Sequence, residues 1–316
     1  DGVQAFSARS GELLWQHQPS ANWAECRVSS WETEQSRIQA AGQQSDAYGM
    51  AKRESWDVDG DSTLDLVLQA VTLVSGESHP AFFVLSGRTG QTLWQSRAKL
   101  SHHEAMPPLT ICDLDGNNRL DILAVEWLLQ SQNDGTSSEP RDDKQRQAVS
   151  LSRWEVGSEE AFWSLPIEGP NDASVINRWN WEADLQSFPR PTLLKIDQDD
   201  VADLALVMEP QSAAEVPQLM IGGVSGRDGQ VIWKNPLGIF GYDQTTIAQS
   251  ERYVTADVDD DDRNDLIFLS FANHKNADNT PGRVAQLRAW DATTGKPKWL
   301  YEYPVANDFM QASKSR

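Results

Sequence analysis

Apolar residues gather in short runs that are bounded by polar turn residues along most of the chain. Two examples are Ala-Phe-Phe-Val-Leu at residues 81–85 and Leu-Ala-Leu-Val-Met at residues 204–208. Runs of this length, rich in aliphatic and aromatic residues, are typical of buried β-strands, and the apolar positions do not follow the 3.6-residue period of a helix. The pattern therefore predicts an all-β chain.

Four acidic loops interrupt the apolar runs, and each leads into a second apolar run. They occupy residues 57–65, 113–121, 197–203 and 257–265, and we call them the first, second, third and fourth loop. Three of them share one register, whereas the third loop is two residues shorter. Self-similarity of this kind indicates a repeat architecture, in which each repeat is one supersecondary unit.

A second signature follows each acidic loop, in which a turn glycine precedes a tryptophan by four residues. The pairs are Gly90 with Trp94, Gly229 with Trp233 and Gly295 with Trp299, and the N-terminal pair of Gly11 with Trp15 has no acidic loop before it. In the second unit the pattern is blurred, and Trp163 fills the same place. A turn glycine supplies the positive φ of a tight hairpin. We expect the indole ring to pack between neighbouring repeats and to carry its N–H to a backbone partner.

Each unit thus holds two hairpins, or four short strands, which is one blade of a β-propeller. We predict about four full blades plus an N-terminal half-blade, forming one domain or a segment of a larger propeller over residues 1–316. The predicted blade units are residues 1–18 (the half-blade), 54–98, 108–167, 190–236 and 252–304, separated by insertions at 19–53, 130–147, 168–188 and 237–251.

The charge of the chain restricts its partners. The formal net charge is −20, from 47 acidic residues against 27 Lys and Arg. Nucleic acids and anionic membranes are bound through positive surface, so neither is an expected partner, and no apolar run is long enough for insertion into a membrane. Divalent cations are the natural counter-charge. The two cysteines, Cys26 and Cys112, allow one disulfide or a buried free thiol at Cys112.

The acidic loops carry the residue types that calcium requires, because Ca²⁺ takes six to eight hard oxygen ligands. Carboxylates at alternate positions, with one backbone carbonyl, can wrap around such an ion, and a glycine or an aspartate allows the sharp turn. The predicted ligands are Asp57, Asp59, Asp61, Thr63 (carbonyl) and Asp65; Asp113, Asp115, Asn117, Arg119 (carbonyl) and Asp121; and Asp257, Asp259, Asp261, Arg263 (carbonyl) and Asp265. The third loop, with Asp197, Asp199 and Asp203, is expected to be a degenerate copy.

The loop pattern resembles the FG-GAP/VCBS repeats of integrin α-chain-type propellers, and the Gly-to-Trp turn resembles the tryptophan-docking motif of quinoprotein-type propellers. The Phe-Gly and Gly-Ala-Pro elements of the first family are absent from the sequence. The resemblance implies that the loops lie on one rim of the propeller and that the connectors between blades form the opposite, binding face. It also implies calcium ligation at the matching aspartates and nothing catalytic.

We expect a non-catalytic calcium-binding module for protein or carbohydrate recognition or scaffolding, outside the cytoplasm, where calcium is millimolar. Trp179 and Trp181 in a connector are candidate ligand contacts, or they plug the propeller face. The alternative is a carbohydrate-active enzyme or a quinoprotein-like dehydrogenase with its site on the connector face. His102, His103 and Glu104 form the one compact group of titratable residues that such an enzyme would use, and a solvated loop is the simpler explanation of them. The sequence does not determine the oligomeric state.

Overall fold

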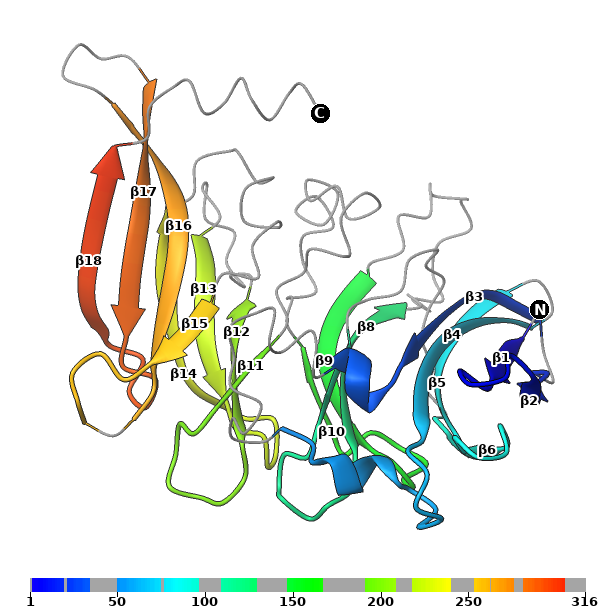
Figure 1. The fold of residues 1–316 in the computed structure, drawn as a ribbon. Helices are drawn as coiled ribbons and strands as arrows, with labels where there is room; N and C mark the ends of the chain where they lie inside the picture. The colour runs from blue at the N-terminus through cyan, green and yellow to red at the C-terminus, as the bar shows by residue number, and fades with distance from the viewer. Residues whose placement is uncertain are drawn as a thin grey trace, which may run out of the picture. The chain divides into compact units, whose positions relative to one another are not determined.

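The computed structural model describes residues 2–19, 22–34, 50–74, 77–96, 109–129, 147–166, 191–208, 218–239, 253–261, 263–275 and 281–304. These residues form an all-β structure, as predicted (Figure 1). One two-stranded sheet is followed along the chain by four four-stranded sheets. Every pair of neighbouring strands is antiparallel.

We name the sheets A to E in chain order. Sheet A consists of β1 (Val3–Phe6) and β2 (Leu13–His17), and sheet B of β3 (Asn22–Ser29), β4 (Leu66–Val74), β5 (Glu77–Leu85) and β6 (Thr92–Gln95). Sheet C consists of β7 (Leu109–Cys112), β8 (Asp121–Leu129), β9 (Gln147–Glu155) and β10 (Trp163–Pro166). Sheet D consists of β11 (Thr192–Leu194), β12 (Asp203–Met208), β13 (Gln218–Val224) and β14 (Val231–Ile239), and sheet E of β15 (Tyr253–Ala256), β16 (Asp265–Lys275), β17 (Pro281–Trp290) and β18 (Pro297–Pro304).

Strand order follows chain order in each four-stranded sheet, so each sheet is two successive hairpins. In sheets C, D and E the acidic loop joins the first strand to the second. Sheet B differs, because a 3₁₀ helix, η1 (Arg53–Trp56), precedes its acidic loop. The first strand of this sheet, β3, comes from residues 22–29, which the sequence pattern assigned to an insertion. The alternation of apolar and polar residues along β3 is interrupted at a register shift between Trp23 and Glu25, and the sequence pattern therefore did not predict this strand.

The contacts divide the chain into two compact units. Unit 1 contains residues 1–186 with 227–229, and unit 2 contains residues 187–226 with 230–316. Sheets A, B and C therefore belong to unit 1. Within each unit, the acidic loops lie at the same end of their sheets (Figure 1).

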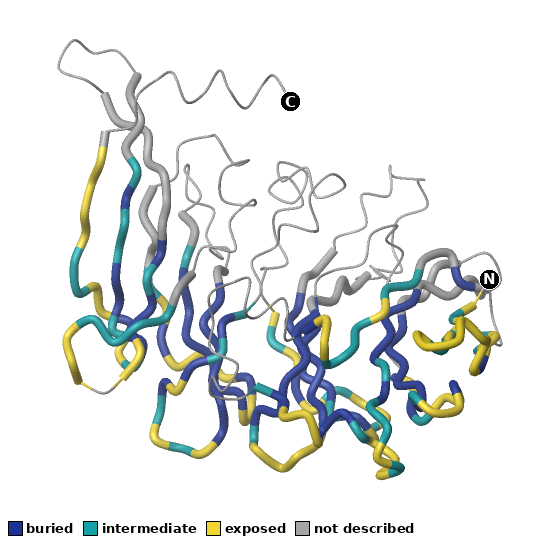
Figure 2. Tube along the Cα trace, viewed as in Figure 1, coloured by how far each residue is buried: buried dark blue, intermediate teal, exposed yellow. Residues whose placement is uncertain are grey.

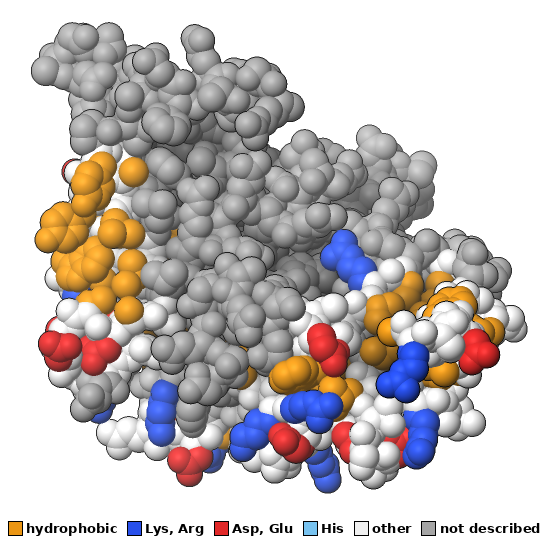
Figure 3. Space-filling model, in the orientation of Figure 1, with side chains coloured by type: hydrophobic (Ala, Val, Ile, Leu, Met, Phe, Trp, Pro, Cys, Tyr) orange, Lys and Arg blue, Asp and Glu red, His pale blue; other side chains and the backbone are white. Residues whose placement is uncertain are grey.

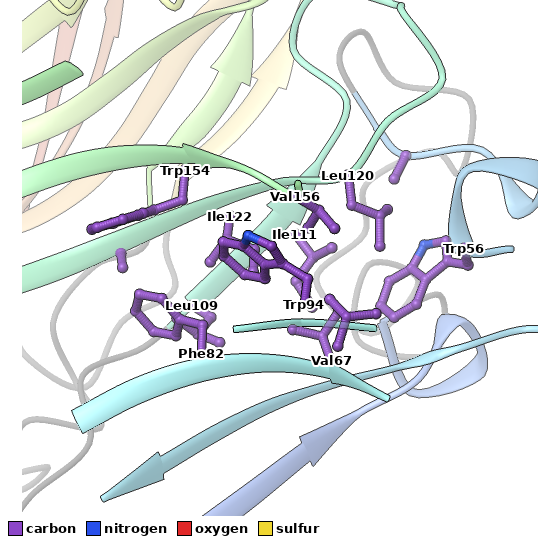
Figure 4. Packing of buried hydrophobic residues seen from close by; sticks show 13 residues of the cluster. Trp56, Val67, Phe82, Trp94, Leu109, Ile111, Leu120, Ile122, Trp154 and Val156 are labelled. Atoms are coloured by element: carbon purple, nitrogen blue, oxygen red, sulfur yellow. The ribbon is translucent and has the colours of Figure 1, made fainter. Parts of the chain in front are cut away.

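Sheet B is buried on both faces, and the alternation of its side chains explains how. On one face, Val67, Phe82 and Val84 pack with residues of sheet C such as Ile111 and Ile122 (Figure 4). On the other face, the intervening residues of β4 and β5 form a second cluster, which Val3 of sheet A joins. Its buried members are Trp23, Leu68, Ala70, Ala81, Phe83 and Leu85. The three sheets of unit 1 are therefore packed face to face. The strand centres of sheets B and C are buried, whereas most of sheet A is exposed or half-buried (Figure 2).

The recurring tryptophans connect one sheet to the next, as the sequence predicts. The Nε1 atom of Trp15 donates to the carbonyl oxygen of Gly87 at 2.8 Å, and that of Trp94 donates to Ser158 at 2.8 Å. In unit 2, Trp233 donates to the Ala292 carbonyl at 2.8 Å. These three indoles are at most 9% exposed. The expected structural role of the tryptophans is confirmed at these positions.

The tryptophan of strand β18 in unit 2 is less buried than those of β2, β6, β10 and β14. Trp299 is half-buried, and Leu300, Tyr301 and Tyr303 are between 49% and 57% exposed. Figure 3 shows apolar side chains gathered on this side of unit 2. Among the residues that the structure describes, no helix is long and apolar enough to cross a membrane.

Candidate metal centre

The acidic loops turn where the sequence predicts. Gly60 and Gly116 have φ values of 75° and 67°, and Asp260, which replaces glycine in the fourth loop, has a φ of 60°. Aspartate reaches the left-handed region more readily than most residues, so the predicted tolerance of Asp260 is confirmed. Each of the three loops thus reverses direction at its fourth position.

Short hydrogen bonds from the loop backbone to its own side chains shape the first two loops in the same way. In the first loop, Oδ2 of Asp57 accepts from the N–H of Ser62 at 2.9 Å, and Oδ1 of Asp61 accepts from Thr63 at 2.8 Å. In the second loop, Oδ2 of Asp113 accepts from Asn118 at 3.0 Å, and Oδ1 of Asn117 accepts from Arg119 at 2.7 Å. The repeated pattern holds the side-chain oxygens toward the inside of each loop.

Each loop brings three carboxylates to within 4.8 Å of one another. The groups are Asp57, Asp59 and Asp61; Asp113, Asp115 and Asp121; Asp197, Asp199 and Asp203; and Asp257, Asp259 and Asp265. The third loop therefore keeps its cluster although it is two residues shorter. Oxygen donors at this spacing suit a hard divalent cation, and the chemistry of the set favours Ca²⁺ over the metals that prefer sulfur or imidazole.

Among the described residues, two buried carboxylate oxygens lack a hydrogen-bond donor, and both belong to the first position of a loop. They are Oδ1 of Asp57 and Oδ1 of Asp113. Asp113 is only 4% exposed, and burial raises its pKa above the ordinary value. A buried, unpartnered carboxylate oxygen is costly unless a cation approaches it. The first two loops could therefore hold a metal ion at the predicted first ligand.

The closing aspartate of a loop has a second role, which is to tie the loop to the turn of the following hairpin. Oδ2 of Asp65 accepts from the N–H of Val58 at 2.7 Å, and Oδ1 accepts from Gly87 at 2.9 Å. Asp203 repeats this arrangement with Ile196 at 2.9 Å and Gly226 at 3.1 Å. Both carboxylates are buried, and burial raises the pKa of each. The cluster of the first loop consists of Asp57, Asp59 and Asp61, without Asp65, whereas Asp203 belongs to the cluster of the third loop.

An arginine takes part in the second loop, which sequence reasoning missed. Arg153, on β9, donates from Nε to Oδ1 of Asp121 at 2.8 Å and from Nη2 to Oδ2 of Asp121 at 3.0 Å. Its Nη2 also lies 2.9 Å from Oδ2 of Asp115, and the Arg153 side chain is 1% exposed. Burial lowers the pKa of this guanidinium, but Asp121 and Asp115 outweigh burial, so the pKa is raised. Arg153 neutralises two of the carboxylates and leaves Oδ1 of Asp113 unpaired.

A lysine occupies the fourth loop in a different way. Lys298, on β18, places its Nζ 2.6 Å from Oδ2 of Asp259 and 2.8 Å from Oδ1 of Asp265. A third contact joins Nζ to Oδ2 of Asp265 at 2.9 Å. Burial lowers the pKa of this ammonium, but its hydrogen bonds to Asp259 and Asp265 prevail, so the pKa lies above its ordinary value. Sequence reasoning missed Lys298 because it lies 33 residues from Asp265.

The carbonyl ligation predicted for Arg119 and Arg263 stays a prediction, and the structure gives the contacts of their side chains. The side chain of Arg119 bonds Glu155 at 2.9 Å and that of Arg263 contacts Thr293 at 3.5 Å, so both point away from their loops. Trp179, Trp181, His102 and His103 lie outside the described residues. Cys26 and Cys112 do not form a disulfide, and Cys112 is buried.

No model of a known protein family matches the chain, and no curated protein matches it either. The class of the site therefore follows from its geometry: repeated loops of oxygen donors, one in each four-stranded sheet.

Proposed function

We propose that this chain is a calcium-binding module of the β-propeller class, in which acidic loops of the repeat, the first and second among them, bind calcium and stiffen the sheets. The observation that carries the calcium assignment is the buried Oδ1 of Asp113, which has no hydrogen-bond donor although Arg153 satisfies its neighbours. The matching atom of Asp57 repeats the observation in the first loop. A cation at these oxygens would remove the repulsion between clustered carboxylates.

The propeller assignment is supported by the sheets of unit 1. Three successive sheets pack face to face, and the tryptophan of each of the first two docks on a turn or loop of the next sheet. Radially repeated four-stranded sheets are how propellers protect their strand edges. We extend this arrangement to the whole chain as part of the proposal.

The repetition of the clusters favours a structural and recognition role over catalysis. A catalytic centre depends on one constellation of positioned groups, whereas here similar carboxylates recur in four loops. We therefore assign the chain to recognition or scaffolding of a protein or carbohydrate partner, in a calcium-rich compartment outside the cytoplasm. The sites of modest affinity that such loops make are filled at millimolar calcium.

Calcium binding is tested by equilibrium dialysis with ⁴⁵Ca²⁺ and by thermal unfolding in calcium and in EDTA. At a hundredfold excess over the dissociation constant, each site should stabilise the chain by about 2.7 kcal/mol. Asp113→Asn removes the charge at the unpaired oxygen and should abolish binding at the second loop, whereas Asp228→Asn, in an exposed turn, should leave it unchanged. Equal midpoints in calcium and EDTA would refute the proposal.

A further inference from the structure

We propose that Lys298 is the resident cation of the fourth loop, so that this loop is complete without calcium and takes none up in the wild-type chain. The inference rests on the proposed function, because it presupposes that acidic loops of this repeat bind calcium and makes the fourth loop an exception. It makes Lys298 a residue that determines which loops bind metal.

The contacts of Lys298 are those that a metal ion would make. Its ammonium touches Asp259 through one oxygen and Asp265 through both, at 2.6 to 2.9 Å. Asp259 and Asp265 are two of the three carboxylates that form the cluster of the fourth loop. A divalent ion at this place would lie against a positive charge, and it would have to displace three charge-assisted hydrogen bonds.

Arg153 bonds two carboxylates of the second loop in a similar way, but there the buried Oδ1 of Asp113 is left without a donor. In the fourth loop the matching Oδ1 of Asp257 accepts from the N–H groups of Asp259 and Asp261, at 3.3 and 3.2 Å. With Lys298 present, the fourth loop therefore does not fit a calcium ion.

The turn of the second hairpin explains why a lysine is needed in this sheet. In sheets B and D, a glycine N–H of that turn donates to the closing aspartate, from Gly87 to Asp65 and from Gly226 to Asp203. A Cβ at Gly87 would lie 1.9 Å from the Leu64 carbonyl oxygen, so this approach requires glycine. Sheet E has Ala292 at the matching position, which is identified by the Trp233 hydrogen bond to its carbonyl.

Lys298 supplies the donor that Ala292 does not. It directly precedes Trp299. The residues that precede the other four tryptophans of the Gly-to-Trp turn are all apolar: Leu14, Leu93, Phe162 and Ile232. Sheet E thus departs from the repeat at two positions at once, an alanine in the turn and a lysine before the tryptophan. Both departures act on the same carboxylate, Asp265, which is 2% exposed.

The test counts calcium ions bound to the full chain by native mass spectrometry and by equilibrium dialysis with ⁴⁵Ca²⁺. We expect Lys298→Met to bind one more ion than the wild-type chain. The added ion should disappear in the double variant Lys298→Met/Asp259→Asn, which places it in the fourth loop. In EDTA the melting temperature of Lys298→Met should fall below that of the wild type, and millimolar calcium should restore it.

Two controls separate site occupancy from a change in net charge. Lys298→Arg keeps the positive charge and should gain no ion, and Lys296→Met removes an exposed charge two residues away and should also gain none. If Lys298→Met does not fold, the variant Ala292→Gly/Lys298→Ile reproduces the arrangement of Gly226 and Ile232 in sheet D and should gain the ion.

The outcomes are distinguishable. If the wild type binds calcium and Lys298→Met binds the same number of ions, the role of Lys298 is overturned while the proposed function stands. If the wild type and every Lys298 variant bind no calcium, the proposed function fails, and the inference fails with it.

Discussion

Trp94 and Ser158 are joined by a hydrogen bond of 2.8 Å from the indole Nε1 to the backbone carbonyl, across the boundary between sheets B and C. The two residues are 64 positions apart in the chain, and the ring is 9% exposed. This hydrogen bond is a specific contact that fixes sheet B against sheet C.

Trp94→Phe should therefore destabilise the chain. The variant keeps an aromatic ring but leaves the Ser158 carbonyl without its donor, and we expect a loss of about 1 to 3 kcal/mol in the free energy of unfolding. Urea denaturation in saturating calcium measures this loss. Trp299→Phe is the matched control, since the half-buried Trp299 lies on the exposed strand β18, and its cost should stay below about 1 kcal/mol. Equal losses for the two variants would contradict the docking role.

Gly87→Ala should disrupt the tie between the first loop and the following turn. The new Cβ would lie 1.9 Å from the Leu64 carbonyl oxygen, so the backbone must move and Asp65 loses the donor at Oδ1. We expect a loss of about 2 to 4 kcal/mol in the free energy of unfolding. Gly116→Ala is the comparison, because Gly116 has a positive φ and open space around its Cβ position, which limits the cost to about 1 to 2 kcal/mol.

Arg153→Met should leave the buried carboxylate of Asp121 without its counter-ion. The two side chains are 1% and 2% exposed, so the expected loss in EDTA is about 3 to 5 kcal/mol. The double variant Arg153→Met/Asp121→Asn removes both charges and should cost less than the sum of the two single variants. A double-mutant cycle in guanidinium chloride gives the coupling, and additive losses would show that the pair is not coupled.

The pH dependence of stability should have opposite signs in the calcium-free and the calcium-bound chain. Burial raises the pKa of Asp113 in the folded state, so the folded chain without calcium binds protons more readily than the unfolded chain. Its stability should rise as the pH falls from about 7 toward about 4. Calcium requires the ionised carboxylate, so calcium affinity should fall over the same range. Asp113→Asn should reduce both dependences, and melting curves at pH 7 and pH 5 test this.

The two cysteines should be chemically distinct thiols. Burial raises the pKa of Cys112 well above its ordinary value, whereas Cys26 is half-buried. Alkylation by iodoacetamide in the native state should therefore label Cys26 first, and Cys112 should react only after unfolding. Mass spectrometry of the unreduced, unfolded chain should find two labels. A single disulfide would give none.

The hairpins and the acidic loops could be predicted because their signals are local. The positive φ of Gly60, Gly116 and Asp260 follows from residue type and spacing alone. Strand β3 could not be predicted, because its pairing with β4 spans the long segment before Leu66 and its alternation is interrupted. Local pattern does not record which distant segment completes a sheet.

The basic partners of the second and fourth loops escaped prediction for the same reason. Arg153 and Lys298 come from later strands, and only the folded sheets bring them to Asp121 and Asp265. A signal for Lys298 was nonetheless present, since it replaces an apolar residue before the tryptophan of the repeat. For Arg153 we find no signal in the sequence.

The direction of the tryptophan contacts has a consequence for synthesis of the chain. Trp15 bonds to a residue 72 positions ahead of it and Trp233 to one 59 positions ahead. These two indoles therefore leave the ribosome well before their acceptors have been made, and sheets A and D reach their final state only when the next sheet has emerged. The sheets should therefore fold in order from the N-terminus. A pause in translation leaves the indole of the last completed sheet without its acceptor and one apolar sheet face exposed, and chaperones can bind that face.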